Sequence, residues 1–469
     1  MRTAYSVESV RRAEQALMAR LPEGALMQRA AAGLAAVCGE MLGRVYGARV
    51  ALLVGSGDNG GDALYAGARL ARRGAGVTAV LLSPERAHPG GLAALRAAGG
   101  RVGGLPARAD LVVDGIIGIG GTGALRPAAA ELVRAVEESG APVVAVDLPS
   151  GVDADTGEVP GPAVTADVTV TFGAHKPGLL IDPGRSRAGV LRLMDIGLDL
   201  GPAGTPAALA YQHADVAALL PRPGAVSDKY RRGVVGIAAG SHRYPGAAVL
   251  VVAGALRGGA GAVRYLGPNG DAVIGRFPET LLGAGRVQAW AVGPGLDDDA
   301  GARERMARAF EAEVPMLVDA DGLRLLAELR PGGRTAPLLL TPHAGEAAAL
   351  LGTERGVVEG ARLASARELA RRYGATVLLK GSTTVVVDAE GPALVNPTGT
   401  GWLATAGSGD VLSGLAGSLL AAGLPSREAA ACGAYLHGLA ARLAPVPPSA
   451  SEVAAALPEA WHEVLRTGG

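Results

Sequence analysis

The feature that most constrains the fold of this chain is an alternation of short apolar runs with longer stretches rich in Ala, Leu and Arg. In the first half, the runs of strand length are Arg49–Val54, Val77–Leu82, Leu111–Asp114, Pro142–Asp147 and Val168–Phe172. Helical stretches such as Ala63–Arg73 and Pro127–Ser139 lie between them. Strand–helix alternation is typical of parallel sheets with helices on both faces, so we expect an α/β fold.

Two further helices are expected before the first strand. Ser6 is a suitable N-cap, and Val7, Val10, Glu14 and Leu17 follow it at helical spacing. A second helix is expected at Leu26–Leu42.

The alternation is interrupted once, and we place a domain junction there, at about residues 205–222. The stretches Asp199–Ala208 and Leu219–Ser227 are rich in Pro and Gly, which disfavour helix and strand. After the junction, strands are expected at Val234–Ala239, Ala289–Val292, Met316–Asp319, Leu338–Thr341, Thr376–Leu379 and Thr384–Asp388. A chain of 469 residues without a short repeat therefore indicates two α/β domains.

Composition excludes several classes of protein. The 44 basic and 44 acidic residues balance, so no overall charge favours nucleic acid or an anionic membrane. The two cysteines, Cys38 and Cys432, are too few for a disulfide framework and indicate a reducing compartment. The start resembles no signal peptide, and the longest apolar stretch, Gly246–Leu256, is too short to span a bilayer. We expect a cytoplasmic protein that binds neither nucleic acid nor membrane.

Lysine is scarce in this sequence. The only lysines are Lys176, Lys229 and Lys380, although arginine is abundant. They are either chance survivors of a composition that favours Arg, or they lie where an ammonium group does what a planar guanidinium cannot.

A glycine-rich loop follows the first strand of the N-terminal half. Gly55, Gly57 and Gly60 match G-x-G-x-x-G, a pattern typical of dinucleotide binding between a strand and a helix. Gly118, Gly120 and Gly123 match it again, so the signal alone is weak. The next strand ends near Glu85, which is poorly placed to hold a ribose, and this disfavours a conventional NAD-dependent dehydrogenase.

Polar residues follow the expected strand ends of this half. They are Asn59, Asp62, Asp114, Asp147 and Ser150. Open α/β sheets bind ligands at the carboxyl ends of their strands, and these oxygens suit a cation or sugar hydroxyls. Taken singly, Ser150 or Asp153 is equally well explained as a helix cap.

A loop with the first lysine, Phe172–Gly178, follows another strand end. Lys176 is expected to point into the same crevice as Asp147, and such a pair is suited to proton transfer. His175 is more simply a bystander in this loop.

Residues 1–200 resemble the YjeF N-terminal family, the epimerases of hydrated NADH and NADPH. The resemblance rests on YSVESVRRAE, LMQRAAAGLA, GSGDNGGDA, DGIIGIGGTG, DLPSGVDADTG and FGAHKPG. It implies a potassium ion bound by Asn59, Asp114 and Ser150, and proton transfer by Asp147 and Lys176. The implied substrate-binding residues are Asn59, Gly60, Gly61, Asp62, Gly118, Ile119, Gly120, Gly121, Thr122, Gly123 and Asp147. The flanks Asp58 and Ala63 depart from the family's usual pattern, and some members are non-catalytic interaction modules.

The strongest feature of the C-terminal half is the segment Asn396–Gly414. No P-loop sequence occurs, because none of the lysines follows a glycine. Instead Gly407, Ser408 and Gly409 precede Asp410 at the start of an apolar stretch, Val411–Ala422. Small residues at a helix N-terminus let amides point at a phosphoryl group, and Asp410 is placed to take a proton from an attacking hydroxyl. The alternative is that Asp410 is a helix cap after a tight turn.

Other strand ends of this half also carry polar or glycine loops. Thr376–Asp388 reads as two strands around LKGSTT, whose lysine and hydroxyls suit nucleotide phosphates. TPHAGE brings His343 and Glu346 to the same edge, and GPGL and DADGL follow two further strands.

These motifs resemble the ribokinase-like superfamily and, within it, the dehydratases of hydrated NAD(P)H. Further pieces are SDKYRRG, GSHRYPGAA and ALRGGAGAVRY. The resemblance implies an ADP-dependent enzyme that needs magnesium and forms homo-oligomers, with Asp410 as base and substrate contact. It also implies Ala255, Gly295 and His343 at the substrate. The implied nucleotide-binding residues are Lys380, Gly381, Ser382, Thr383, Thr384 and Gly409. Lys229 matches a usual lysine of the family, without a firm role.

Together the two resemblances predict a repair enzyme for hydrated NADH and NADPH (NADHX and NADPHX). We expect two three-layer αβα domains: a Rossmann-like epimerase at residues 1–207 and a ribokinase-like dehydratase at residues 215–469. The first would interconvert the R and S hydrates, and the second would dehydrate the S form with ADP, giving AMP and phosphate. The alternative is a ribokinase-like small-molecule kinase fused to a non-catalytic domain.

Overall fold

The computed structural model describes residues 1–201, 204–298, 300–329 and 334–467. Their contacts divide the chain into two compact units. The N-terminal unit is Thr3–Ala208, and the C-terminal unit is Leu209–Gly469 together with Met1–Arg2. Residues 202–203 of the Pro/Gly-rich stretch lie outside the described residues.

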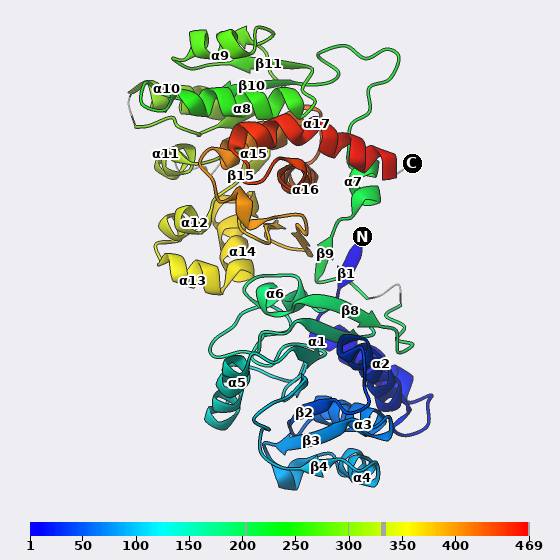
Figure 1. The fold of residues 1–469 in the computed structure, drawn as a ribbon. Helices are drawn as coiled ribbons and strands as arrows, with labels where there is room; N and C mark the ends of the chain where they lie inside the picture. Colours follow the sequence, from blue (N-terminus) through cyan, green and yellow to red (C-terminus); the bar gives the residue numbers. More distant parts are fainter. Residues whose placement is uncertain (202–203, 299, 330–333, 468–469) are drawn as a thin grey trace. The chain divides into compact units, whose positions relative to one another are not determined.

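The N-terminal unit is built on a parallel sheet (Figure 1). Among the described residues it has seven strands in the order β4-β3-β2-β5-β6-β7-β8. They are β2 (Arg49–Val54), β3 (Gly76–Leu81), β4 (Arg101–Val102), β5 (Leu111–Gly115), β6 (Val143–Val146), β7 (Val168–Phe172) and β8 (Val190–Met194). The five strands expected from the sequence are all present, with ends shifted by at most one residue.

Helices cover both faces of this sheet. They are α1 (Val7–Met18), α2 (Ala25–Leu42), α3 (Asp58–Arg72), α4 (Pro89–Ala97), α5 (Pro127–Ser139) and α6 (Gly184–Arg187), with short 3₁₀ turns at Pro84–Arg86 and Pro177–Leu179. Val50, Leu52 and Val54 of β2 pack in one core with α2 and α3, whereas Ala51 and Leu53 pack in another with α5. Alternate side chains of a strand point to opposite faces, so the unit has three αβα layers.

The start of α3 differs from the expectation. The sequence predicts a helical stretch over Ala63–Arg73, but α3 begins at Asp58. Asn59 and Asp62 therefore lie in its first turn. A Cβ added to Gly60 would lie 2.3 Å from the Gly55 carbonyl oxygen, so glycine allows this turn to pack closely on the end of β2.

The sheet of the C-terminal unit has eleven strands among the described residues, in the order β1-β9-β18-β17-β16-β15-β14-β13-β10-β11-β12. From β12 to β16 the pairings are parallel, and β16–β17 and β17–β18 are antiparallel, as the expected LKGSTT hairpin requires. The strands are β1 (Arg2–Ala4), β9 (Ala208–Ala210), β10 (Val234–Ala238), β11 (Ala262–Tyr265), β12 (Leu281–Leu282), β13 (Ala289–Val292), β14 (Met316–Val318), β15 (Leu338–Leu340), β16 (Thr376–Leu379), β17 (Val385–Val387) and β18 (Ala393–Val395).

The helices of this unit also form two layers. They are α7 (His213–Leu219), α8 (Pro245–Arg257), α9 (Gly270–Arg276), α10 (Ala300–Glu311), α11 (Asp321–Leu329), α12 (Ala344–Leu351), α13 (Arg355–Gly360), α14 (Arg362–Tyr373), α15 (Ser408–Ala421), α16 (Ser426–Leu443) and α17 (Ala450–Thr467), with a 3₁₀ turn at Gly401–Leu403. Leu317, Leu339 and Leu378 belong to one buried core with residues of α8, α15, α16 and α17. The alternate residues of these strands are buried too. On that face α10 contacts β10 and β13, α11 contacts β14, and α14 contacts β16 and β17. The expected pair of three-layer αβα domains is thus confirmed.

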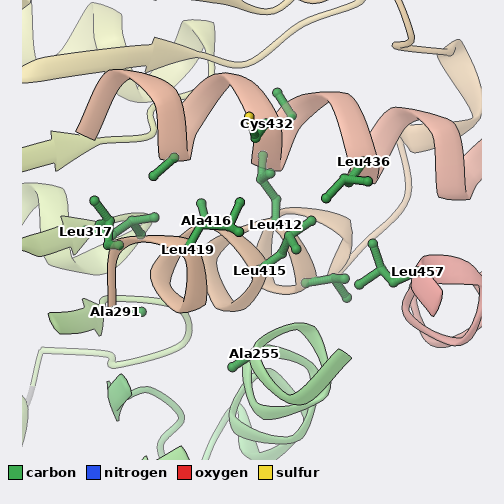
Figure 2. Packing of buried hydrophobic residues seen from close by; sticks show 14 of the residues in the cluster. Ala255, Ala291, Leu317, Leu412, Leu415, Ala416, Leu419, Cys432, Leu436 and Leu457 are labelled. Carbon is green, nitrogen blue, oxygen red and sulfur yellow. The ribbon is translucent and has the colours of Figure 1, made fainter. Parts of the chain in front are cut away.

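The core of the C-terminal unit is built around α15, which is buried on nearly all sides (Figure 2). Leu412, Leu415 and Leu419 of α15 pack among residues of α8, α16 and α17. The backbones of α8 and α15 approach closely, because a Cβ added to Gly414 would lie 1.9 Å from the Val251 carbonyl oxygen. This packing fixes the N-terminus of α15, which carries Asp410.

No helix among the described residues is both long and apolar enough to cross a membrane.

Candidate functional site in each unit

A cavity of about 1470 Å³ lies at the carboxyl ends of the N-terminal strands. Of the residues expected to bind substrate, the structure brings these to its wall: Asn59, Asp62, Gly118, Ile119, Gly120, Gly121, Thr122 and Asp147. Gly60, Gly61 and Gly123 are not among its lining residues. Residues from α1 and α2 complete the wall, among them Arg11, Glu14 and Met27.

Asp147 and Lys176 form a buried ion pair beside this cavity. Lys176 Nζ lies 2.5 Å from Asp147 Oδ1, and it also donates to Thr171 Oγ1 at 3.0 Å and to the Phe172 carbonyl oxygen at 3.2 Å. The lysine side chain is 1% exposed. Asp147 adopts a φ of 67°, a strained conformation for a non-glycine residue that is common at functional sites. The pair is therefore held in one geometry by its surroundings.

Asp114 and Ser150 meet at the ends of β5 and β6. The Ser150 hydroxyl donates to Asp114 Oδ1 at 2.7 Å, and the Ser150 amide donates to Oδ2 at 2.8 Å. Burial raises the pKa of Asp114 to about 6, although these hydrogen bonds limit the rise. Asn59 lines the cavity, and its side-chain amide donates to the Val146 carbonyl oxygen at the end of β6 at 2.5 Å. Asp114 and Ser150 are buried and are not among the residues that line the cavity.

Two carboxyls of the cavity have raised pKa values. Asp62 is 6% exposed, and its Oδ1 is buried without a hydrogen-bond partner. Burial, with the charges of Asp147 and Asp58, raises the pKa of Asp62 well above its usual range. Burial and the charge of Asp147 also raise the pKa of Glu14. The sequence placed Glu14 on its helix but gave no sign that this helix would line the site.

In the C-terminal unit, the segment before α15 forms the turn that the glycines predicted. Gly407 is the N-cap residue and has a φ of 85°, which favours glycine. Ser408, Gly409 and Asp410 form the first turn of α15. Amides at the start of a helix of this length attract anions, so the turn is suited to a phosphoryl group.

Lys380 lies beside this turn and is held by two carboxylates. Its Nζ is 2.6 Å from Asp319 Oδ1 and 3.7 Å from Glu346 Oε2. The Ser413 hydroxyl of α15 donates to Asp319 Oδ2 at 2.7 Å. A Cβ added to Gly409 would lie 3.4 Å from Lys380 Nζ, so the ammonium and the amide turn are adjacent. The strand ends of β14 and β16 thus meet the start of α15.

Asp410 is a carboxyl tuned to titrate near neutral pH. Burial raises its pKa to about 7, the charge of Asp319 adds to the rise, and that of Lys380 opposes it. Asp321 and Glu346 raise it further. A pKa near the working pH is what a general base needs. This arrangement favours a chemical role for Asp410 over that of a simple helix cap.

The other residues expected to bind the nucleotide lie in the turn after β16. Gly381 and Ser382 are exposed, and the Thr384 hydroxyl donates to the Gly381 carbonyl oxygen at 3.2 Å. The turn therefore presents backbone and hydroxyl groups next to Lys380.

Three further residues of the C-terminal unit were expected at the substrate, and they differ in exposure. His343 is exposed and caps α12, where its ring nitrogen accepts a hydrogen bond from the Glu346 amide at 3.0 Å. Gly295 follows β13 and is partly exposed. Ala255 does not fit the expectation that it lines the substrate site, because it is fully buried in the core between α8 and α15 (Figure 2). Lys229 is exposed, with its ammonium 5.3 Å from the centre of the Tyr230 ring.

Both halves match known families. A family model described as "YjeF-related protein N-terminus" matches residues 23–178, and one described as "NAD(P)H-hydrate dehydratase" matches residues 235–460. The chain is 51% identical over 466 residues to the bifunctional NAD(P)H-hydrate repair enzyme Nnr of Mycobacterium leprae, covering 97% of this chain and 96% of that protein. The chain belongs to the family of bifunctional NAD(P)H-hydrate repair enzymes. The resemblance inferred from the motifs of each half is confirmed.

More distant relatives of this NAD(P)H-hydrate repair family agree. The Escherichia coli K12 enzyme of the same name is 36% identical over 413 residues, covering 83% of this chain and 79% of that protein. An ADP/ATP-dependent NAD(P)H-hydrate dehydratase from Bacillus subtilis, co-crystallised with ATP and Mg²⁺, is 29% identical with a TM-score of 0.52. It covers 55% of this chain and 99% of that chain. A ribokinase-like superfamily protein from Enterococcus faecalis, 23% identical with a TM-score of 0.50, shares the fold.

Sequence reasoning left some residues of these repair-enzyme sites without a role. Asp319 and Glu346 were noted only as members of strand-end motifs, and their pairing with Lys380 was not foreseen. Ser413 lies three residues after Asp410 on the same helix. This spacing puts the two on one face of the helix, and it was the sequence signal that could have identified Ser413. For Glu14, no local signal exists.

Proposed function

We propose that this chain restores hydrated NADH and NADPH through two successive reactions. Residues 1–207 form the epimerase, which interconverts the R and S hydrates. Residues 215–469 form the dehydratase, which uses ADP to convert the S hydrate to NAD(P)H with release of AMP and phosphate. One observation carries this proposal. This chain of the family has a buried Asp147–Lys176 pair in one unit and Asp410 beside Lys380 in the other.

In the dehydratase unit, Asp410 takes the proton of the hydrate's hydroxyl as that oxygen attacks the terminal phosphorus of ADP. The first turn of α15 and the Lys380 ammonium stabilise the charge on the transferred group. Phosphate then leaves with the C–O bonding electrons, and loss of a proton from the adjacent ring carbon restores the double bond. Asp319 and Ser413 hold Lys380 in place for this step.

Magnesium fits this site as a companion of the nucleotide. The charges of Asp319, Asp321 and Glu346 raise the pKa of Asp410, so these carboxylates lie within electrostatic range of it. Magnesium is usually held by one or two carboxylates together with substrate phosphates. When bound, it would neutralise phosphate charge. The turn Lys380, Gly381, Ser382, Thr383 and Thr384, with Gly409, would hold the AMP portion.

In the epimerase unit, the cavity would hold the hydrate, with the Asp147–Lys176 pair at the ring. Asn59, Asp114 and Ser150 would hold a potassium ion, which suits their oxygen donors. When bound, the ion would supply positive charge at the ends of β5 and β6.

The decisive experiment follows the dihydronicotinamide absorbance after enzyme, Mg²⁺ and ADP are added to mixed R and S hydrates. We expect recovery of the whole mixture, with one phosphate released per NAD(P)H formed. A small-molecule kinase would instead leave a stable phosphate ester. Absence of recovery with both ADP and ATP would overturn the dehydratase assignment, and recovery limited to the S fraction would overturn the epimerase assignment.

A further inference from the structure

Glu14 is a carboxyl of the N-terminal cavity that the function proposed above does not use. It lies on α1 and lines the same cavity as Asp147, which follows β6. Among the described residues, no hydrogen bond or ion pair engages the Glu14 carboxyl. A bound molecule can therefore interact with it without breaking a protein contact.

The start of α1 is fixed to the loops that carry the site. The Tyr5 amide donates to the His175 carbonyl oxygen at 2.9 Å, next to the lysine of the ion pair. The Val7 amide donates to Asp155 Oδ1 at 2.8 Å. Because both contacts lie at the start of a continuous helix, Glu14 has a defined position relative to those loops.

The charges around Glu14 favour a proton on it. Burial raises the pKa of Glu14, and the negative charges of Asp147 and, to a smaller extent, Asp58 add to the rise. Lys176 and Arg11 oppose it. A carboxyl with a raised pKa retains more of its protonated form near neutral pH, and this form is the one that donates a proton.

An independent feature points to a ligand in this cavity. Asp62 also lines the cavity and is only 6% exposed. Its Oδ1 atom is buried and has no hydrogen-bond partner. A buried polar atom left unpaired is destabilising. A hydrogen-bonding group of a bound molecule, such as a hydroxyl or carboxamide, can pair with this oxygen.

Inversion of a hydrate needs chemistry on both faces of one ring carbon. Water adds to the enamine double bond of a dihydronicotinamide with its hydroxyl on the carbon bonded to the ring nitrogen. To invert that carbon, the hydroxyl gains a proton, the C–O bond breaks, and water leaves with the bonding pair. The nitrogen lone pair forms a C=N bond meanwhile. Water then adds to this carbon from the other face, and the electron pair of the C=N π bond returns to nitrogen. The added water loses a proton and becomes the new hydroxyl.

We propose, building on the epimerase function proposed above, that Glu14 and Asp147 are the two proton-transfer groups of this inversion. One carboxyl protonates the departing hydroxyl, and the other accepts a proton from the water that adds. Each inversion moves one proton from one carboxyl to the other, so the resulting state is ready for the reverse inversion. Lys176 holds the Asp147 carboxyl group in position.

The test is the rate of R-to-S conversion by the full-length chain, followed by chromatographic separation of the two hydrates. Loss of a general acid–base group typically slows a reaction about 10²–10⁴-fold, so Glu14→Gln should lose at least about 100-fold in kcat with little change in KM. Glu14→Asp should recover part of the rate, and the wild-type rate should depend on pH through a group absent from Glu14→Gln. Glu8→Gln is the matched control, since Glu8 lies on the same helix, is 81% exposed and pairs with Arg12.

The outcomes separate this inference from the proposed function. A wild-type enzyme that interconverts the hydrates, together with a Glu14→Gln variant within about threefold of it, would overturn the role of Glu14 alone. A change confined to KM would also overturn it, because it would indicate a role in binding. A loss in Glu14→Asp and in Glu8→Gln equal to that of Glu14→Gln would overturn it too, because it would indicate helix packing. If the wild type does not exceed the spontaneous rate, both the epimerase function and this inference fail.

Discussion

Lys380 Nζ lies 2.6 Å from Asp319 Oδ1, although 61 residues separate the two in sequence. Burial by itself would lower the pKa of Lys380, but the charges of Asp319 and Glu346 outweigh it and raise the pKa. The ammonium therefore stays charged beside the first turn of α15. A charged, oriented lysine at a helix N-terminus is what transfer of a phosphoryl group requires.

Replacement of Lys380 tests this arrangement. Lys380→Met should reduce ADP-dependent recovery of NAD(P)H at least about 100-fold, because one charged donor to the transition state is lost. Lys380→Arg should rescue it poorly, since a planar guanidinium does not replace a point charge between Asp319 and Glu346. Initial rates at saturating S hydrate and varied ADP measure both effects. Lys229→Met, at an exposed position, is the matched control, and equal losses in the two Met variants would contradict a specific role for Lys380.

Asp410→Asn should abolish recovery while ADP binding largely persists. The wild-type rate should rise with pH through about 7, because the base must be ionised and the pKa of Asp410 is raised to about 7. The same shift lowers stability as pH rises from about 4 to 7, since the folded state binds the proton more tightly than the unfolded state. Asp410→Asn should therefore melt at a higher temperature than wild type at pH 8 and at nearly the same temperature at pH 4. An active Asp410→Asn variant would remove Asp410 from the role of base.

The buried ion pair of the N-terminal unit predicts a selective defect. Lys176→Met should slow use of the R hydrate and leave use of the S hydrate unchanged, because only the R form needs the epimerase. It should also destabilise the chain by about 3–5 kcal/mol, since Asp147 is left buried without its partner. The double variant with Asp147→Asn should regain part of that stability without regaining activity. Denaturant titration and the two pure hydrates measure these effects, and an equal loss on both hydrates would indicate misfolding instead.

Potassium should affect one half of the enzyme only. We expect R-to-S conversion to fall when K⁺ is replaced by an organic cation, while dehydration of pure S hydrate continues. Asp114→Asn should remove the K⁺ dependence, because it removes the carboxylate that Ser150 orients. A K⁺ response unchanged by Asp114→Asn would place the ion elsewhere.

The close contact of α8 with α15 predicts a strong effect of a single methyl group. Gly414→Ala should destabilise the C-terminal unit by about 1–3 kcal/mol or more, because its Cβ would lie 1.9 Å from the Val251 carbonyl oxygen. Gly275→Ala in α9 is the matched control, since nothing lies within 4 Å of its added Cβ. It should be neutral or stabilising by up to about 1 kcal/mol. Similar melting temperatures for the two variants would contradict this packing.

The sequence by itself determined the layers of both units and the edges where their sites lie. Alternating apolar runs and helical stretches fix local structure through their periodicity, so β2 and β7 were predicted with their observed bounds. Parallel strands bring their carboxyl ends to one edge, and this was sufficient to place Asp114, Asp147 and Lys380 at the carboxyl-end edges of their sheets. The start of α3 was misjudged, because the close approach of Gly60 to Gly55 depends on packing that local propensity does not record.

Only the tertiary structure decided which side chains meet and what their surroundings do to them. It paired Lys380 with Asp319, brought Glu14 to the cavity of Asp147, and buried Ala255 in the core. It also raised the pKa of Asp410 to about 7. Distances between residues remote in sequence, and the loss of water around a charge, arise from the packing of whole layers. A local pattern specifies the elements, but the energy of each charge in a site depends on its neighbours in space.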